Sequence, residues 1–275
     1  MLGYRIKLAA VALPLLALTV SAIQAKADET RLLLTGSSTI APIAEEIAHL
    51  YEEKNQDVRI DIQTGGSTKG VIDQRRGLND IAMVSRRLKP SESDLTAHTF
   101  ALDGLAMIVH EDNAVEDLSS DDIRAIYTRK KTDWSDFGDD GGEIIIINKS
   151  EGRATLDLFL DHFGLIPPDI KPHMVIGENE QGIKAVAGNR SAIGYVAIST
   201  AFYDAEHGVA IKLVGLDGVL ATVENVANGS YPAIRQLNLV TAGEVSKTTQ
   251  AFLDFAQSEA VHEILDTFHV VAPSR

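Results

Sequence analysis

The stretch TGSSTIAP, residues 35–42, indicates the fold class, because an apolar run ends there and a helical pattern begins within a few residues. The run before it predicts a short strand, and residues 40–51 repeat apolar side chains at the three- and four-residue spacing of a buried helix face. Three consecutive hydroxyl side chains lie between the two patterns. Since Ser and Thr commonly cap helices, we expect Ser38 or Thr39 to cap this one, with Pro42 in its first turn.

The same kind of strand-to-helix junction recurs twice along the chain. GGST, residues 65–68, follows the alternating strand pattern VRIDIQ, and EGRAT, residues 151–155, follows the apolar run EIIIIN. A further strand pattern, DIAMVS, ends at Ser85 and is followed by Arg86 and Arg87. Strands that alternate with helices predict a parallel sheet covered by helices. In such a sheet a ligand binds outside the carboxyl ends of the strands, where all of these residues lie.

The alternation continues to the end of the chain and predicts two α/β lobes joined by crossing strands near residues 105–110 and 228–238. The strand patterns HMVIG and SAIGYVAI belong to the second lobe, and two amphipathic helices close the chain. We expect residues 28–107 and 231–275 to form the first lobe. Residues 108–230 then form the second lobe.

Residues 1–27 have the composition of a bacterial export signal. A basic start is followed by an apolar stretch, residues 8–22, and by A-K-A at residues 25–27, which is a cleavage signal. The apolar stretch is shorter than the roughly 20 residues of a membrane span, and Pro14 interrupts it. We therefore expect a mature periplasmic chain that begins at Asp28 and, without a cysteine near the cleavage site, is not lipidated.

Charge and composition exclude several classes of function. The net charge of the whole chain is −14, and loss of the three cations of the export signal changes it to −17. So acidic a surface disfavours nucleic acid and anionic membranes as partners. A small anion is still compatible, because salt screens distant charges beyond about 8 Å and a buried site depends on its local donors. The absence of cysteine excludes disulfide and thiol chemistry.

Motifs of enzymes and metal sites are missing. The chain has no G-x-S-x-G elbow, no H-E-x-x-H and no Walker loop. The acidic DDGG at residues 139–142 lacks the spacing of an EF-hand and predicts a turn. Trp134 is expected to pack within its own loop. We expect no enzymatic activity, no cofactor and no metal.

The junctions favour the binding of a small anion. The first amides of a helix lack internal partners and the helix dipole adds about half a positive charge there, while hydroxyls add donors and glycine allows close backbone approach. Arg86 and Arg153 offer planar forks that match a tetrahedral oxyanion. For Arg87 and Lys149 we expect solvated surface positions.

In this order, the junctions resemble those of the periplasmic phosphate-binding proteins of ABC transporters, the PstS-type solute-binding family. The resemblance extends from Leu32 to near the C-terminus, and includes LSSDDIRAIYTRKKTDWSDFG, residues 118–138, and AIGYVAI, residues 192–198. It implies a type II periplasmic-binding-protein fold, a Venus-flytrap clamp in which each lobe is a mainly parallel sheet flanked by helices. The clamp of that family closes on dehydrated phosphate.

The resemblance also implies the binding residues. Ser38 and Thr39 would donate from the first junction, Ser67 from the second, and Ser85 from the end of the third strand. The full set expected to bind phosphate or a related oxyanion is Ser37, Ser38, Thr39, Gly66, Ser67, Thr68, Ser85, Arg86, Glu151, Gly152, Arg153 and Thr155.

The sequence departs from the family pattern at two places. The family usually has D-G-S-G-T where this chain has E-G-R-A-T, so that Arg153 replaces a serine. The family often has Asp directly after the serine of the third strand, as acceptor for the proton of hydrogen phosphate, and this chain has Arg86. An acceptor carboxylate distinguishes protonated phosphate from ionised sulfate. Glu151 either supplies that acceptor or pairs with an arginine, and the choice among phosphate, sulfate, arsenate and molybdate stays open.

We therefore expect a monomeric solute-binding protein that captures phosphate, or a similar tetrahedral oxyanion, and delivers it to an ABC permease of the inner membrane. Two alternatives stay open. The same clamp would report the anion to a signalling receptor, or a secreted phosphoester hydrolase would use Ser38 or Ser67 as nucleophile. The hydrolase needs a base beside its serine, and no histidine is near either residue in the sequence.

Overall fold

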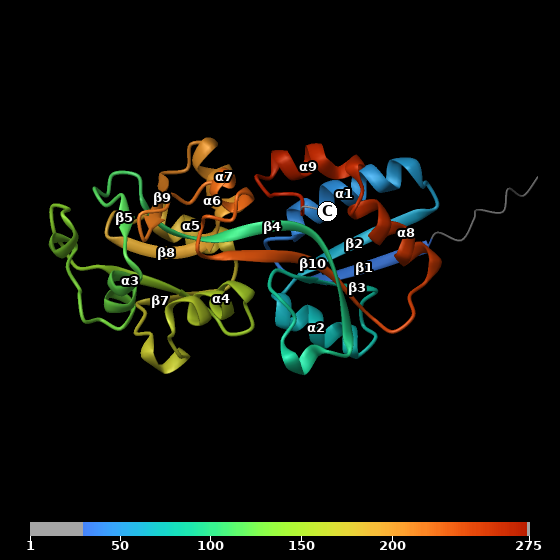
Figure 1. Ribbon diagram of the computed structural model, residues 1–275, viewed down its shortest axis with the longest axis horizontal. Helices are drawn as coiled ribbons and strands as arrows, with labels where there is room; N and C mark the ends of the chain where they lie inside the picture. Colours follow the sequence, from blue (N-terminus) through green and yellow to red (C-terminus); the bar gives the residue numbers. More distant parts are fainter. Residues whose placement is uncertain (1–29, 274–275) are drawn as a thin grey trace, which may run out of the picture.

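The computed structural model describes residues 30–273, so the predicted signal peptide lies outside the described residues. Two α/β halves lie side by side, and two strands run from one half toward the other (Figure 1). The predicted two-lobed α/β architecture is therefore confirmed. Within residues 30–273, no helix combines the length and the apolar character that crossing a bilayer requires.

The first lobe is the half that contains the start of the described chain and its end. Its strand β1 pairs in parallel with β2 and with β3, as the alternating patterns predict. Helices α1, α8 and α9 cover one face of this sheet, and α2 covers the other (Figure 1). Its elements are β1 (Thr30–Gly36), α1 (Ala41–Lys54), β2 (Val58–Thr64), α2 (Ser67–Arg75), β3 (Ile81–Val84), η1 (Pro90–Glu92), α8 (Lys247–Ala256), η4 (Glu259–Val261) and α9 (His262–Thr267).

The second lobe is built around β6, which pairs in parallel with β7 and β8. Trp134 lies in its core with 1% of its surface exposed and donates Nε1–H to the carbonyl of Ser191 at 2.9 Å, so the predicted packing role is confirmed. The elements of this lobe are β5 (Asp117–Leu118), α3 (Ser120–Tyr127), η2 (Trp134–Phe137), β6 (Ile145–Lys149), α4 (Ala154–Phe163), η3 (Pro167–Asp169), β7 (Met174–Ile176), α5 (Asn179–Ala187), β8 (Ala192–Ala197), α6 (Ile198–Glu206), β9 (Ile211–Leu216) and α7 (Val223–Ala227).

Two antiparallel strands, β4 (Leu95–His110) and β10 (Ile234–Ala242), connect the lobes. β10 also pairs with β3 of the first lobe, and the end of β4 pairs with β8 and β9 of the second. Both crossing strands extend further into the first lobe than predicted. The buried apolar residues divide between the lobes at these strands. Those within residues 105–233 pack in the second lobe, and those outside this range pack in the first. The predicted lobe boundaries at 107/108 and 230/231 stay predictions.

The helices at the three junctions begin without a side-chain cap. α1 begins at Ala41, so the expectation that Ser38 or Thr39 caps it is wrong, although Pro42 does lie in the first turn. The hydroxyls instead belong to a turn in which the amide of Thr39 donates to Ser37 Oγ at 3.2 Å. α2 and α4 also have no side-chain cap, whereas α3, α7 and α8 do. Capping by neighbouring side chains therefore does not explain the hydroxyls at these three junctions.

Candidate functional site

Three serine hydroxyls meet where β1 and β3 end and α2 begins. Ser37 Oγ donates to Ser85 Oγ at 2.9 Å, and Ser67 Oγ lies 3.4 Å from Ser85 Oγ. The amide of Ser85 donates to Ser67 Oγ at 3.1 Å. All three side chains are buried. The parallel strands end at the same edge of the sheet, so residues far apart in the sequence form one hydroxyl cluster.

Thr39 connects the first lobe to the second. Its Oγ1 accepts hydrogen bonds from Asn179 Nδ2 at 3.1 Å and from Arg235 Nη2 at 3.0 Å. Asn179 begins α5 of the second lobe, and its Oδ1 accepts from Lys149 Nζ at 3.0 Å. All four residues are buried. One buried polar network, which we call the Thr39 network, thus joins both lobes and the crossing strand β10.

Within the Thr39 network, Arg235 is held by a carboxylate on the other crossing strand. Its Nη2 donates to Asp103 Oδ2 at 2.8 Å, and both side chains are 1% exposed. Asp103 Oδ1 accepts the amide of Ser199 at 3.1 Å. Arg235 Nη1 is buried and has no hydrogen-bond partner among the described residues. An unpaired buried donor destabilises a protein. A ligand that accepts a hydrogen bond from Arg235 Nη1 would therefore be bound favourably.

Lys149 ends β6 and is 2% exposed, so the expected surface position is wrong. The buried phenol of Tyr195 accepts the amide of Lys149 at 3.3 Å and donates to Asn148 Oδ1 at 2.5 Å, which fixes this strand end. Burial, together with the nearby Arg235, lowers the pKa of Lys149 to about 7. The cause is loss of hydration of the charged amine. A bound anion would favour the charged form.

Arg86 follows the serine cluster in sequence, but its guanidinium is directed at carboxylates. Nη1 and Nη2 donate to the two oxygens of Glu92 at 2.7 and 2.8 Å. Nε lies 3.2 Å from Asp157 Oδ2 on α4, and Lys89 Nζ lies 3.0 Å from the same oxygen. Burial raises the pKa of Glu92, but the hydrogen bonds from Arg86 outweigh it, and the pKa lies below its ordinary value. Arg86 therefore bridges the lobes through an ion-pair group.

The second-lobe junction approaches the first lobe through its backbone. The carbonyl of Gly152 accepts the amide of Thr68 at 3.3 Å. Gly66 has φ +93°, and a Cβ there would lie 2.8 Å from that carbonyl oxygen, so this approach requires glycine. Arg153 extends beside Gly66 and donates Nη1–H to Glu178 Oε1 at 2.7 Å. The two lobes are thus in direct contact at the predicted site.

The other predicted residues differ in exposure. Thr155 is buried in the first turn of α4, whereas Ser38 is only partly buried. Glu151 is exposed, so its carboxylate does not belong to the Thr39 network. Arg87 is exposed, as expected. The structure thus groups three predicted serines in one cluster and brings Thr39 and Thr68 into contact with the second lobe, but it leaves Glu151 at the surface.

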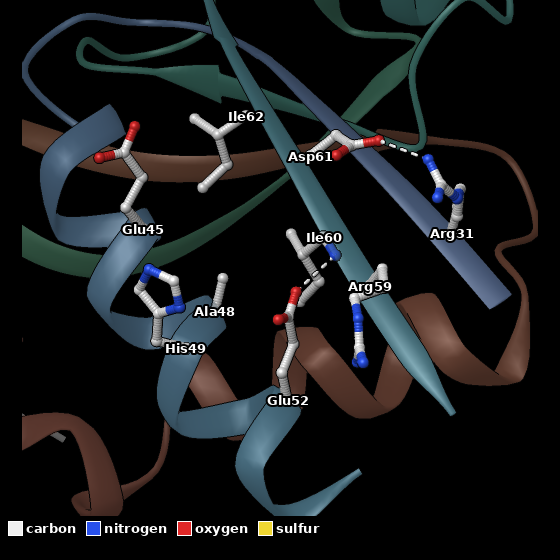
Figure 2. A pocket seen from close by; sticks show the side chains of 9 residues that line it. All are labelled: Arg31, Glu45, Ala48, His49, Glu52, Arg59, Ile60, Asp61 and Ile62. Carbon is white, nitrogen blue, oxygen red and sulfur yellow. Dashed lines mark hydrogen bonds and ion pairs between the residues drawn. The ribbon is translucent and has the colours of Figure 1, made fainter. Parts of the chain in front are cut away.

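One hollow lies beside these elements, and another lies away from them. One of ≈ 330 Å³ lies between the lobes and is lined by Arg86, Asp157 and Arg235, among others. Another of ≈ 370 Å³ lies between α1 and the outer strand β2, away from the junctions (Figure 2). There Glu52 accepts the amide of Ile60 at 2.7 Å, which satisfies a donor at the edge of the sheet. The described residues contain no His, Cys, Asp and Glu group suited to a metal ion. Of the two, the hollow between the lobes is the better candidate site, because Arg235 of the Thr39 network lines it, although the buried serines do not.

Sequence reasoning missed Asn179, Arg235 and Asp103, and it assigned Lys149 to the surface. Asn179 begins α5 directly after β7, so the strand-to-helix rule applied to this fourth junction would have found it. The same rule would have included Lys149, which ends the apolar strand β6. Asp103 and Arg235 lie within crossing strands, and no local pattern distinguishes them from ordinary strand residues.

Comparisons with known proteins agree with this geometry. A family model described as PBP superfamily domain matches residues 21–260. The phosphate-binding protein PstS of Bacillus subtilis is 28% identical over 242 residues, which cover 86% of this chain and 78% of that protein. The phosphate-binding protein PstS of Borreliella burgdorferi is 22% identical and covers 87% of this chain and 88% of its own length.

Two solved structures resemble the chain over nearly all of the described residues. One, described as a phosphate ABC transporter substrate-binding protein with bound phosphate, is from Clostridium perfringens. It has a TM-score of 0.84 at 30% identity and covers 89% of this chain and 100% of its own. The second is an ABC-type phosphate transport receptor from Vibrio cholerae. It has a TM-score of 0.73 at 25% identity and covers 89% of this chain and 100% of its own.

Proposed function

Because this chain belongs to the PBP superfamily, in its PstS-type branch, we propose that it captures phosphate, or a similar tetrahedral oxyanion, for delivery to an ABC transporter. The anion is held between the two lobes, without chemical conversion. The protein is exported to the periplasm as a monomer without a lipid anchor. The relatives named as phosphate-binding proteins and the phosphate-bound structure support this assignment.

The observation that supports the proposal most strongly is the surplus of buried donors where the lobes meet. Arg235 Nη1 has no hydrogen-bond partner among the described residues, and Lys149 Nζ has a neutral acceptor in Asn179. A buried cation is stable only with a counter-charge or several charge-assisted hydrogen bonds. A tetrahedral anion supplies both, since each of its oxygens accepts hydrogen bonds and each such bond contributes about 1.5–3 kcal/mol.

We assign the anion contacts to the buried hydroxyls and to two cations. Ser37, Ser67 and Ser85 donate from the first lobe, Thr39 from the network, and Thr155 from the start of α4. Lys149 and Arg235 supply the positive charge. Arg86 donates to Glu92 through both Nη atoms, and Arg153 pairs with Glu178, so we assign these two arginines to the contact between the lobes. Arg235 also pairs with Asp103, but its Nη1 has no hydrogen-bond partner among the described residues.

The experiment that tests this function is titration calorimetry of the mature chain with phosphate, arsenate, sulfate and molybdate. We expect phosphate to bind at micromolar concentration or below. Thr39→Ala and Ser67→Ala should each weaken binding by about 10- to 100-fold, at about 1.4 kcal/mol per factor of ten. Thr222→Ala, which removes the side-chain cap of α7, is the control that should keep wild-type affinity. Failure of all four anions to bind would refute the proposal.

The hydrolase alternative gains no support from the geometry. A serine nucleophile needs a base within hydrogen-bond distance. Within residues 30–273, Ser67 Oγ has only Ser85 as its hydrogen-bond partner, and neither Ser67 nor Ser38 hydrogen-bonds to a histidine or a carboxylate.

A further inference from the structure

Two hollows between the lobes each reach one member of the Thr39 network. One has a volume of ≈ 330 Å³ and is lined by Arg235 and by part of α4, and we call it the α4 hollow. The other, the α6 hollow, has a volume of ≈ 210 Å³ and is lined by Thr39, Glu180 and part of α6, including Asp204. The two helices lie on opposite sides of the crossing strands (Figure 1). An anion therefore has two routes to the network, and the routes differ in charge.

The α4 hollow is lined by four cations, and three of them have carboxylate partners. These ion pairs are Arg86 with Glu92, Lys89 with Asp157, and Arg235 with Asp103. The fourth cation, Arg87, is exposed and has no ion-pair partner among the described residues. In a chain with a net charge of −14, an unpaired cation at the rim of a hollow attracts anions to that place.

Arg87 lies close to the serine cluster. It follows Ser85 by two residues, so their two Cα atoms are within about 7 Å of each other. Salt at physiological concentration has a Debye length of about 8 Å and screens the charge of Arg87 only partly over this distance. In the α6 hollow, by contrast, the carboxyl groups of Glu180 and Asp204 oppose the approach of an anion.

The charges that line the α4 hollow come from both lobes. Residues 86–89, RRLK, belong to the first lobe together with Ser85, whereas Asp157 lies on α4 of the second. Lys89 Nζ and Asp157 Oδ2 are 3.0 Å apart in the described arrangement, and separation of the lobes breaks this ion pair. The separated first lobe thus presents Arg87 and Lys89 beside the serine cluster as attracting charges.

We propose that the RRLK segment captures the anion on the first lobe while the lobes are apart, with Arg87 as the positioning residue that attracts it to the serine cluster. This inference rests on the proposed function and adds a route of entry to the same site. Closure brings Asp157 to Lys89 and so neutralises an attracting charge at the rim. The anion passes to the buried donors, among them Arg235 Nη1. Arg87 stays at the rim and does not contact the bound anion.

Rate measurements separate capture from final binding, because a charge at the rim changes association whereas a buried contact changes release. The chain has no cysteine, so Asp161→Cys in the second-lobe wall of the α4 hollow accepts a single fluorescent label that reports closure on phosphate. In this parent at about 10 mM ionic strength, Arg87→Gln should lower the association rate constant by about threefold or more, and Arg87→Glu by about tenfold. The dissociation rate constant should change by less than about twofold in both.

Three comparisons show whether the effect is electrostatic and local. At about 1 M sodium chloride, where the Debye length is about 3 Å, the parent and both Arg87 variants should associate at the same rate. Arg190→Gln is the matched control, because it removes an exposed arginine of the second lobe and changes the net charge by the same amount as Arg87→Gln. It should behave like the parent. Asp204→Asn tests the other route and should also leave the association rate unchanged.

Other results overturn the inference and differ from a failure of the proposed function. Equal association rates for the parent and both Arg87 variants at low ionic strength refute the role of Arg87 and leave phosphate binding intact. Faster release with unchanged association in Arg87→Gln refutes capture, because Arg87 is then a contact of the bound anion. Faster association in Asp204→Asn places the entry at the α6 hollow. If the unlabelled chain binds no anion by calorimetry, the proposed function and the inference both fail.

Discussion

Arg235 and Asp103 form a pair whose members are 1% exposed, and this pair connects the two crossing strands. A buried ion pair contributes little net stability compared with apolar residues, but loss of one partner leaves an unpaired charge in a dry environment. The pair therefore orients the guanidinium, with Nη2 at both Asp103 and Thr39 and Nη1 available to a ligand. Arg235 therefore contributes to stability through Nη2 and to anion binding through Nη1.

We predict that Arg235→Gln destabilises the protein by about 3–5 kcal/mol, because it leaves the Asp103 carboxylate buried and unpaired. Urea unfolding followed by circular dichroism measures this change. The double variant Asp103→Asn/Arg235→Gln should recover most of the stability, since no buried charge is left. Phosphate affinity should stay reduced in both variants. Recovery of affinity in the double variant would mean that Arg235 does not contact the anion.

At the scale of elements, the starts of α2 and α4 determine how closely the lobes approach. Neither helix has a side-chain cap, and the two starts touch through the Thr68 amide and the Gly152 carbonyl. Gly66, the residue before α2, has φ +93°, a conformation that glycine adopts without steric cost. The junction thus uses glycine for its backbone angle and for the space that it leaves to the second lobe.

Gly66→Ala should therefore weaken phosphate binding by about tenfold or more, because a Cβ there would lie 2.8 Å from the Gly152 carbonyl oxygen. Gly77→Ala is the matched control. Gly77 also has a positive φ, +65°, but nothing lies within 4 Å of the added Cβ. Both variants should lose stability, measured by thermal unfolding, and Gly66→Ala should lose more, because φ +93° with ψ 155° is a conformation that almost only glycine adopts. Only Gly66→Ala should lose affinity by calorimetry. Equal affinities in the two variants would contradict the close approach.

For the whole molecule, the described arrangement has the two lobes in contact at several separate places. Besides the Thr39 network, Asp157 of the second lobe meets Arg86 and Lys89 of the first. Such contacts exist only when the lobes are together, so they stabilise that arrangement relative to a separated one. Anion binding adds contacts from both sides and shifts the equilibrium in the same direction.

Asp157→Ala should lower phosphate affinity by about three- to tenfold, because fewer contacts hold the lobes together and more of the binding energy is used for closure. Small-angle X-ray scattering should show a larger radius of gyration than wild type at the same subsaturating phosphate concentration. Asp136→Ala, which changes an exposed aspartate in η2 of the second lobe, is the control and should behave like wild type. An unchanged affinity and radius in Asp157→Ala would exclude a role of this ion-pair group in closure.

The order of strands and helices, the two-lobed class and the positions of the three junctions were predictable from the sequence. These features follow from apolar periodicity and from glycine and hydroxyl residues at element ends, which are local properties of the chain. The serine cluster was predictable for the same reason, since parallel strands end at one edge of a sheet.

The role of each cation, in contrast, follows from its surroundings in the folded protein. Lys149 is buried rather than solvated, Arg86 faces Glu92 and Asp157, and Arg235 reaches Thr39 from 196 positions away in the sequence. A charged side chain takes its role from the groups that surround it after folding. Its burial and its partners depend on which loops and lobes meet, and local periodicity contains no information about that.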